Sequence, residues 1–232
     1  MAVLGLIPAR GESKGIPRKN IKELNGYPLI AYSIAQGLQS NLIDRLIVST
    51  DDDEIKSVAE KYGAEVPFIR PDHLASSTAS SFDAILHAVD WLEEQGAKYD
   101  TVCLLQATSP YRPEGIIDQA LEKYRHEKLD SLVSLRKVPD HYNPHWTFRE
   151  KPGGIFETSF PGELISRRQD LPAAYHRDGA LYILSVDSMR KTGKLLGPRL
   201  GGIEIESPEL INIDSSSDWE VAERYMNYAS FG

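Results

Sequence analysis

Short apolar runs alternate with segments of helical periodicity along most of the chain, and this alternation restricts the possible folds more than any other feature of the sequence. The apolar runs, which read as strands, lie at residues 3–7, 46–48, 102–105, 131–135 and 180–184. Helical patterns lie between and after them, at 28–38, 53–62, 80–95, 113–124 and 217–228. In the first of these, Ile30, Ile34 and Leu38 share one helix face. Strands that alternate with helices predict an α/β fold, with a mostly parallel sheet covered by helices on both faces.

The alternation stops between about residues 137 and 176. This stretch contains five prolines and a Gly-Gly pair, and it is too long for an ordinary connection. Two interpretations remain open: a lid over a site, or an arm that packs against another subunit. In either case apolar contact area would come from Trp146, Phe148, Phe156 and Phe160. We expect a single domain over 1–232, with 137–176 as a dimerisation or lid insertion.

Charge and cysteine content exclude several classes of protein. Lys and Arg number 26 and Asp and Glu 34, so the net charge is −8 and an overall basic surface for nucleic acid is absent. No apolar run approaches the roughly 20 residues that span a bilayer, so we expect no membrane segment. Residues 1–10 read as a first strand, not a signal peptide. The single Cys103 excludes an intrachain disulfide and reads as an inert core thiol, so a reducing compartment, the cytoplasm, is the expected location.

A basic loop with two glycines directly follows the first predicted strand. It runs from Ile7 to Asn20 and is neither a Walker loop nor a GxGxxG fingerprint. Gly11 and Gly15 allow the backbone to approach a ligand closely. The side chains that can bind or neutralise a triphosphate are those of Arg10, Ser13, Lys14 and Lys19. A solvated surface loop is the alternative, but cations and glycines together after a buried strand favour phosphate binding.

Five stretches, in order along nearly the whole chain, resemble the acylneuraminate cytidylyltransferases, the family of CMP-sugar-acid synthetases. The first is the loop itself, where residues 9–20 meet the signature Ala-Arg-x-x-Ser-Lys-Gly-x-x-x-Lys-Asn. The others are Arg70-Pro-x-x-Leu-Ala-x-x-Thr-Ala-Ser-Ser81, Leu104-Leu-Gln-Ala-Thr-Ser-Pro110, Arg168 with Arg177-Asp-Gly-Ala-Leu-Tyr182, and Asn212-Ile-Asp214. The resemblance implies a Rossmann-like nucleotidyltransferase fold, which agrees with the predicted sheet. It also implies transfer of CMP from CTP to an acidic keto-sugar, with release of pyrophosphate.

The resemblance assigns CTP binding to residues that match the family pattern. The phosphates would be surrounded by Ala9, Arg10, Ser13, Lys14 and Lys19. Asn20 would reach the ribose. Arg70 and Ser81 would contact the pyrimidine, where an arginine donor suits the O2 acceptor of cytosine. From the residues alone, Ser80 and Ser81 can equally form a helix cap.

The same resemblance places the acidic sugar against Gln106, Arg168 and Tyr182. Arg168 would pair with the sugar carboxylate. By pattern alone, Gln106 opens a turn built from Thr, Ser and Pro, and Tyr182 reads as a half-buried strand residue. Leu195 and Leu196 stand where sialic acid enzymes carry aromatic residues, so we expect an apolar sugar pocket and leave the identity of the sugar open.

Asn212 and Asp214 occupy the place of the family's metal-binding pair of aspartates. Residues one apart on a strand share a face, and an asparagine carbonyl can ligate a hard cation such as Mg²⁺ or Mn²⁺, although without charge. We therefore expect a weaker metal site or a different arrangement of ligands. Asp218 reads as part of the final helix's first turn, and the run 51–53 as a solvated loop and helix start.

The implied reaction is an in-line attack of the sugar's anomeric hydroxyl on the α-phosphorus of CTP. Arg10, Lys19 and Asp214 are the expected catalytic residues, through charge stabilisation and metal binding. No general base is identified, and His176 reads as structural or exposed. CTP and an acidic sugar are the expected partners, in a homodimer whose subunits complete each other's sites. The alternatives are a nucleotidyltransferase for a phosphorylated substrate, a nucleotide-binding homologue with impaired catalysis, and, with least support, a structural or partner-binding domain.

Overall fold

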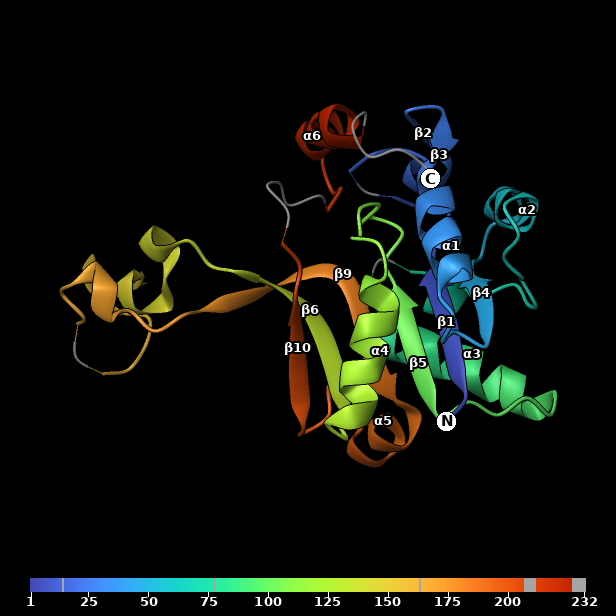
Figure 1. Ribbon diagram of the computed structural model, residues 1–232. Coiled ribbons are helices and arrows are strands. Elements are labelled where there is room, and N and C mark those ends of the chain that lie inside the picture. The colour runs from blue at the N-terminus through green and yellow to red at the C-terminus, as the bar shows by residue number, and fades with distance from the viewer. Residues whose placement is uncertain (14, 77, 163, 207–211, 227–232) are drawn as a thin grey trace.

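The centre of the molecule is a six-stranded sheet, shown in Figure 1 as part of a computed structural model that describes residues 1–13, 15–76, 78–162, 164–206 and 212–226. In spatial order its strands are β10 (Leu200–Glu204), β6 (Ser131–Lys137), β9 (Tyr175–Ser185), β5 (Thr101–Leu105), β1 (Val3–Pro8) and β4 (Arg45–Ser49). β9 is antiparallel to both of its neighbours, and the other pairs are parallel. The predicted α/β sheet is therefore confirmed, and it is mixed and mostly parallel.

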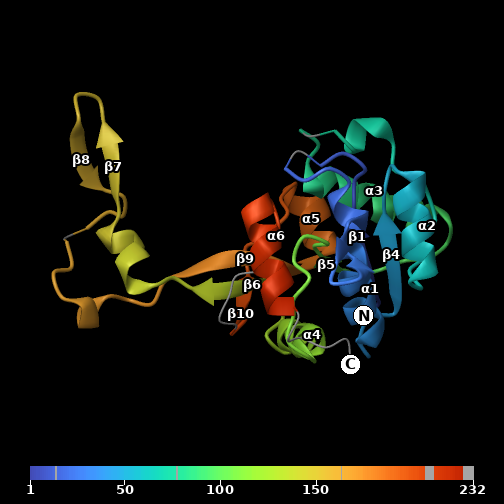
Figure 2. The ribbon, with the colours of Figure 1, turned by 90° about the horizontal axis from the view of Figure 1, so that it is seen from above.

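Helices cover both faces of this sheet (Figures 1 and 2). One face carries α1 (Leu29–Gln39), α2 (Asp53–Lys61) and α4 (Ile116–His126), and the other carries α3 (Ser81–Glu94) and α5 (Val186–Thr192). β1 explains why the central strands read as continuous apolar runs. Its Val3 and Ile7 belong to the first core cluster, whereas Leu4 and Leu6 belong to the second. A strand buried on both faces needs apolar side chains at every position.

A third, smaller core lies at the edge of the sheet where the parallel strands end. There α6 (Ser216–Met226) packs near the short hairpin of β2 (Glu23–Leu24) and β3 (Tyr27–Pro28), with Trp219 and Leu24 in one cluster. The Asp218 carboxylate accepts a hydrogen bond of 2.7 Å from the backbone N–H of Ser215 and so caps the helix. The helix predicted to start at 217 begins one residue earlier, at Ser216. Asp218 in the first turn is confirmed.

β10 is the strand that the sequence pattern does not indicate, because two of its residues are glycines. A Cβ on Gly201 would lie 2.2 Å from Leu129 Cδ1, and one on Gly202 would lie 2.3 Å from Leu135 Cδ1. Core leucines therefore occupy the space that side chains would need at these positions. Because neighbouring side chains fill this space, the strand carries glycine there. It therefore lacks the run of apolar residues by which a strand is recognised in the sequence.

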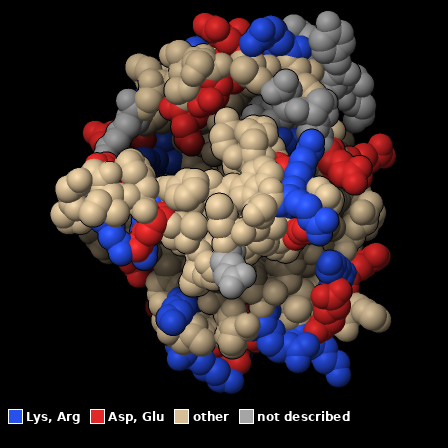
Figure 3. Space-filling view, turned by 90° about the vertical axis from the view of Figure 1, so that its left-hand side faces the viewer, with Lys and Arg blue, Asp and Glu red and all other residues tan. Residues whose placement is uncertain are grey.

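Between β6 and β9 the chain leaves the sheet as an arm, residues 138–174, which projects sideways from the molecule (Figures 1 and 2). It contains a hairpin and three 3-10 turns: β7 (Phe148–Lys151), β8 (Ile155–Thr158), η3 (Asp140–Tyr142), η4 (Pro144–Trp146) and η5 (Arg168–Asp170). Its exposed large apolar side chains are Tyr142, Phe148, Ile155, Phe156, Phe160 and Leu164. Figure 3 looks onto this side of the molecule, and uncharged side chains dominate its centre.

None of the helices in the described part of the chain has the length and hydropathy that crossing a lipid bilayer requires.

Candidate active site

A cavity of about 650 Å³ opens where β1 and β5 end. Its walls come from segments far apart in the sequence, which the parallel sheet brings to one edge. They are the loop after β1, the stretch from Arg70 through the 3-10 turn η2 (Asp72–Leu74) to the start of α3, the turn after β5, part of β9, and the segment before α6. Ten of the sequence-predicted residues line it: Arg10, Ser13, Lys19, Asn20, Arg70, Ser81, Gln106, Tyr182, Asn212 and Asp214.

The loop after β1, residues 9–20, is called the phosphate loop from here on. It packs against the segment that precedes α6. Lys19 opens the 3-10 turn η1 (Lys19–Ile21) and is 9% exposed. Its Nζ donates to the Ile213 carbonyl at 2.6 Å and lies 3.1 Å from Asp214 Oδ1. A Cβ on Gly15 would lie 2.1 Å from the Asp214 carbonyl oxygen, so glycine is required for this close approach. The predicted phosphate loop and the predicted metal pair therefore form one continuous wall.

Ala9, another member of the phosphate-loop prediction, is not among the residues that line the cavity. Ala9 is 1% exposed, and its N–H donates to the Ser49 carbonyl at 3.0 Å, so it lies beneath the loop within the core. Lys14 lies outside the described residues. Asn20 supports the loop from inside, because its side-chain amide donates to the Arg10 carbonyl at 3.0 Å.

Arg70 forms the opposite wall and is held rigidly. It is 5% exposed, its Nε donates to the Ser49 hydroxyl at 3.0 Å, and its Nη2 donates to the Ser49 carbonyl. Burial lowers the pKa of the guanidinium. Such a fixed cationic donor suits a carbonyl acceptor on a bound ligand.

Ser80 and Ser81, which lie next to Arg70 in the cavity lining, have different tasks. The Ser80 hydroxyl accepts a hydrogen bond of 3.1 Å from the backbone N–H of Phe82 and so is the N-cap of α3. Ser81 is the first residue of the helix. The helix-cap interpretation is thus confirmed for Ser80, and it leaves the Ser81 side chain outside the cap.

Arg112 supports the elements around the cavity, and sequence reasoning missed it. It is 5% exposed. Its guanidinium donates hydrogen bonds of 2.7–3.1 Å to four acceptors, which are the carbonyls of Gln106 and Ala180 and the side chains of Ser33 and Gln36. Burial lowers its pKa to about 10. It therefore ties the end of β5, which carries Gln106, to the part of β9 that lines the cavity. The sequence signal for Arg112 is its place two residues after the turn Thr108-Ser109-Pro110.

β9 contributes a glycine and a tyrosine to the cavity. Gly179 has a φ of 85°, in the left-handed region that glycine adopts most readily. The preceding Asp178 is 6% exposed and accepts hydrogen bonds from the Ser134 hydroxyl and from the Ala180 N–H, the latter at 3.0 Å. These bonds hold the backbone bend that brings Gly179 and Tyr182 to the cavity.

Asn212 and Asp214 present oxygen ligands beside the phosphate loop. The Asn212 Nδ2 donates to Asp214 Oδ2 at 3.2 Å, and its Oδ1 accepts from the Ser109 hydroxyl at 3.4 Å. The Asp214 side chain is 69% exposed. A carboxylate and an amide oxygen are ligands of the kind that Mg²⁺ takes, and they can face one ion when the Asn212 amide turns its oxygen, which now accepts from Ser109, toward Asp214. Within the described ranges, no group of three or more His, Cys, Asp or Glu side chains forms a metal site.

Leu195 and Leu196 do not reach this cavity. Both pack against the core cluster beneath α3 and α5. The physical reason is the direction of β9: because the strand is antiparallel, its last residue, Ser185, pairs with Thr101 at the start of β5. The chain therefore leaves β9 at the opposite edge of the sheet. The residues that follow Tyr182 therefore lead away from the cavity, and Leu195 and Leu196 do not line the predicted sugar pocket.

Arg168 is also remote from the cavity of its own chain. It opens η5 in the arm, its side chain is 76% exposed, and its Nε donates to Asp140 Oδ2 at 2.5 Å. Arg168 is not among the described residues that line the cavity. His176, at the base of the arm, is exposed as predicted.

Known proteins that are similar to this chain include cytidylyltransferases and CMP-sugar-acid synthases. A family model described as "Cytidylyltransferase" matches residues 4–191. The pseudaminic acid cytidylyltransferase of Campylobacter jejuni subsp. jejuni serotype O:23/36 is 36% identical, over 96% of this chain and 95% of that protein. The CMP-N,N'-diacetyllegionaminic acid synthase of Legionella pneumophila subsp. pneumophila is 31% identical, over 97% of each.

Among solved structures, a CMP:2-keto-3-deoxy-manno-octonic acid synthetase complexed with CTP superposes with a TM-score of 0.74. The match covers 99% of this chain and all of that one at 15% identity, so it bears on the fold alone. It confirms the predicted nucleotidyltransferase architecture. Together with the full-length relatives and the family model, these findings show that the chain belongs to the cytidylyltransferase family and is a nucleotidyltransferase of the CMP-sugar-acid synthetase type.

Proposed function

We propose that the protein transfers CMP from CTP to the anomeric hydroxyl of a nonulosonic acid and releases pyrophosphate. The observation that carries the proposal is the composition of the cavity. Arg10 and Lys19 face one part of it, Arg70 another, and Gln106 with Tyr182 a third, while Asp214 stands beside Lys19. The full-length relatives named for pseudaminic and legionaminic acid support a sugar of this class.

CTP is proposed to lie across the phosphate loop with its base toward Arg70. Arg10, Ser13, Lys14 and Lys19 bind the phosphates, and Ala9 anchors the start of the loop through its N–H, which donates to the Ser49 carbonyl. Asn20 contacts the ribose, and it braces Arg10 in the structure. Arg70 and Ser81 read the pyrimidine edge, for which the rigid attachment of Arg70 to Ser49 is suited.

The sugar is proposed to lie against Gln106 and Tyr182, at the junction that Arg112 holds. Its carboxylate needs a cation, and Arg168 is the arginine that the family resemblance assigns to it. Since Arg168 lies in the arm, we propose a homodimer in which the arm of one subunit places Arg168 at the cavity of the other. The exposed apolar side chains of the arm support this assembly, because an unpaired apolar surface of this kind marks a contact site.

A divalent cation, Mg²⁺ or Mn²⁺, is proposed to bind Asp214 and Asn212. When bound, it supplies positive charge to the phosphate oxygens and polarises them for displacement. The chain's own residues bind and orient the reactants. Lys19 and Arg10 stabilise the charge that develops on the departing pyrophosphate, and Gln106 and Tyr182 orient the sugar toward the α-phosphorus. Because Lys19 is buried and held by Ile213, it needs no reorganisation during the reaction.

The test is pyrophosphate release from CTP with Mg²⁺ over a panel of nonulosonic acids, shorter keto-sugar acids and sugar phosphates. Pseudaminic acid comes first because its enzyme is 36% identical to this chain. Each active sugar is repeated with UTP, ATP and GTP. Release with CTP and a sugar acid is the expected result. Release with a sugar phosphate alone would assign the protein to transferases for phosphorylated substrates, and CTP binding without release would indicate a homologue with impaired catalysis.

A further inference from the structure

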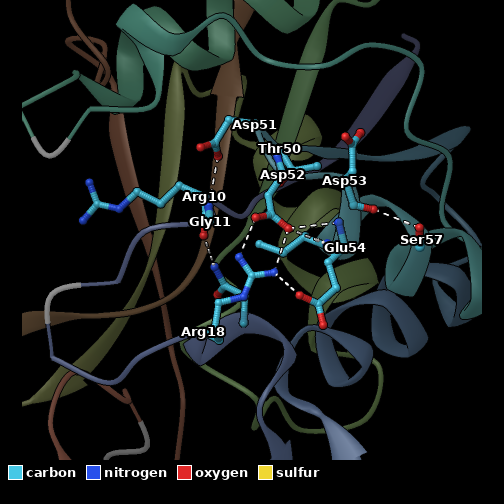
Figure 4. Close-up of polar contacts among 11 residues, drawn as sticks. Arg10, Gly11, Arg18, Thr50, Asp51, Asp52, Asp53, Glu54 and Ser57 are labelled. Carbon is cyan, nitrogen blue, oxygen red and sulfur yellow. Dashed lines mark hydrogen bonds and ion pairs between the residues drawn. The ribbon is translucent and has the colours of Figure 1, made fainter.

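The phosphate loop has a second set of contacts on the side away from the cavity, at the junction of β4 and α2 (Figure 4). The Gly11 N–H donates to Asp51 Oδ1 at 3.0 Å. Arg18 donates to both oxygens of Asp52, at 2.5 and 2.9 Å, and to Glu54 Oε2 at 2.5 Å. Both ends of the loop are therefore attached to one neighbouring segment that lines no part of the cavity.

The backbone of Arg18 is in the left-handed conformation, with φ 53° and ψ 30°. A residue with a Cβ disfavours this region unless the surroundings hold it there. The Arg18 carbonyl accepts hydrogen bonds from the N–H groups of Ile21 and Lys22, at 3.1 and 3.0 Å, and so starts η1. Because η1 carries Lys19 and Asn20, the conformation of Arg18 sets the direction in which both side chains enter the cavity wall.

Asp52 connects this turn to a helix. Its Oδ1 accepts from the N–H groups of Glu54 and Ile55, at 3.0 and 2.9 Å, as the N-cap of α2. The hydrogen bonds from Arg18 lower the pKa of Asp52 to about 2, so the carboxylate is ionised at neutral pH. A Cβ on Gly11 would lie 2.7 Å from Asp52 Oδ2, so the loop fits against the carboxylate without spare space. The predicted helix start at 51–53 is confirmed, and it has this additional contact.

Two carboxylates neutralise Arg18, and it does not line the cavity. Its side chain is 40% exposed, where a single ion pair would contribute little to folding stability. The pair instead fixes the shape of the loop. Arg18 contacts both oxygens of Asp52, Asp52 is held in place as the N-cap of α2, and the backbone of Arg18 is held in the left-handed conformation. A loop that is ordered in advance loses less conformational freedom when it binds a triphosphate.

We propose that Arg18 and Asp52 are positioning residues that hold the phosphate loop in its binding conformation before CTP arrives. The proposal rests on the proposed binding of CTP to this loop. Neither residue contacts the nucleotide. Their effect passes through η1 to Lys19 and Asn20, and through Gly11 to the neighbouring Arg10.

Three variants separate this role from the other tasks of the two residues. Asp52→Asn keeps an oxygen for the N-cap of α2 but loses the charge that pairs with Arg18. Arg18→Gly leaves the left-handed backbone accessible but removes the guanidinium. Arg18→Lys keeps the charge without the fork. Arg45→Gln is the matched control, because it breaks another arginine–carboxylate pair, with Glu65 at 2.6 Å, at the opposite end of β4.

The first readout is amide hydrogen exchange without nucleotide. We expect faster exchange over residues 10–22 in Asp52→Asn and Arg18→Gly, an intermediate effect in Arg18→Lys, and no change in Arg45→Gln. The α2 amides should stay protected in Asp52→Asn, since the cap persists. Exchange in the loop that matches the Arg45→Gln control in both main variants would overturn the proposal.

The second readout is CTP affinity by calorimetry together with steady-state kinetics. We expect about tenfold weaker CTP binding in Asp52→Asn and Arg18→Gly, and a KM for CTP raised in proportion with kcat little changed. Unaltered CTP affinity in these variants would overturn the positioning role. If the wild-type protein bound no CTP, the proposed function would fail, while the exchange experiment would still decide whether Arg18 and Asp52 hold the loop.

Discussion

The buried ammonium of Lys19 lies 3.1 Å from the carboxylate of Asp214, although the two residues are 195 positions apart in the sequence. The contact joins the phosphate loop to the proposed metal ligands. A cation and an anion that meet at the wall of a cavity can both interact with a bound metal–triphosphate, the ammonium with phosphate oxygens and the carboxylate with the metal.

Lys19→Ala is expected to lower kcat/KM for CTP by about a hundredfold, since one preorganised charge at the phosphates is removed. Pyrophosphate release under steady-state conditions measures the effect. Lys22→Ala is the matched control: this lysine is three residues away and lies over the Trp219 ring at 4.2 Å, outside the cavity lining. Equal loss in both variants would show that general loop charge, not the position of Lys19, matters.

Asn212→Asp is expected to lower the Mg²⁺ concentration at half-maximal activity, because a charged ligand replaces a neutral one. The same change places two carboxylates where Asn212 now donates to Asp214 at 3.2 Å. Like charges at that distance repel, so the melting temperature should fall without divalent cations and recover when Mg²⁺ is added. A Mg²⁺ titration of activity and of melting temperature, with Asp214→Asn as the opposite change, checks both parts. Identical titrations for wild type and Asn212→Asp would argue against metal binding here.

Arg112→Ala is expected to destabilise the fold by about 3 kcal/mol or more, because the carbonyls of Gln106, just after β5, and of Ala180, within β9, lose their donor. Arg112→Lys should recover only part of this loss, since one ammonium cannot span the acceptors on α1, β5 and β9. Urea unfolding gives the free energies. Arg125→Ala, an exposed arginine on α4, is the control and should change stability by less than about 0.5 kcal/mol.

Subunit complementation tests the proposed contribution of Arg168 across the dimer. Arg168→Ala and Lys19→Ala should each be nearly inactive alone. In a mixed dimer, the cavity with an intact Lys19 faces the arm with an intact Arg168, so mixing equal amounts should restore about a quarter of wild-type activity. Sedimentation velocity confirms that both variants stay dimeric. Absence of any recovery in the mixture would place Arg168 in the cavity of its own chain or outside catalysis.

The features that local pattern predicts correctly are those that depend on neighbours in sequence. The apolar run of β1 followed by Gly11 and Gly15 indicates a strand and a loop, and the structure has the strand at Val3–Pro8 with the loop after it at the cavity. The helices on both faces follow from residues three and four apart. The strand order places these loops at one edge, which explains why ten predicted residues meet in one cavity.

The features that the sequence did not reveal depend on distant partners. Arg112 reads as one more charged residue until its acceptors, 68 and 76 positions away, are known. The position of Leu195 and Leu196 depends on the direction of β9, and no local pattern distinguishes an antiparallel central strand from a parallel one. The Arg18–Asp52 pair is likewise invisible, because two residues with ordinary surface character meet only when β1 and β4 lie side by side.

β9 belongs to two parts of the molecule at once. Its first residues, Tyr175 to Arg177, pair with β6 alone at the root of the arm, whereas Tyr182 to Leu184 are paired with both β6 and β5 within the sheet. Gly179 and Tyr182, at the cavity, fall at this transition. One continuous strand, with no intervening helix, therefore connects the arm to the wall of the cavity where we propose that the sugar binds.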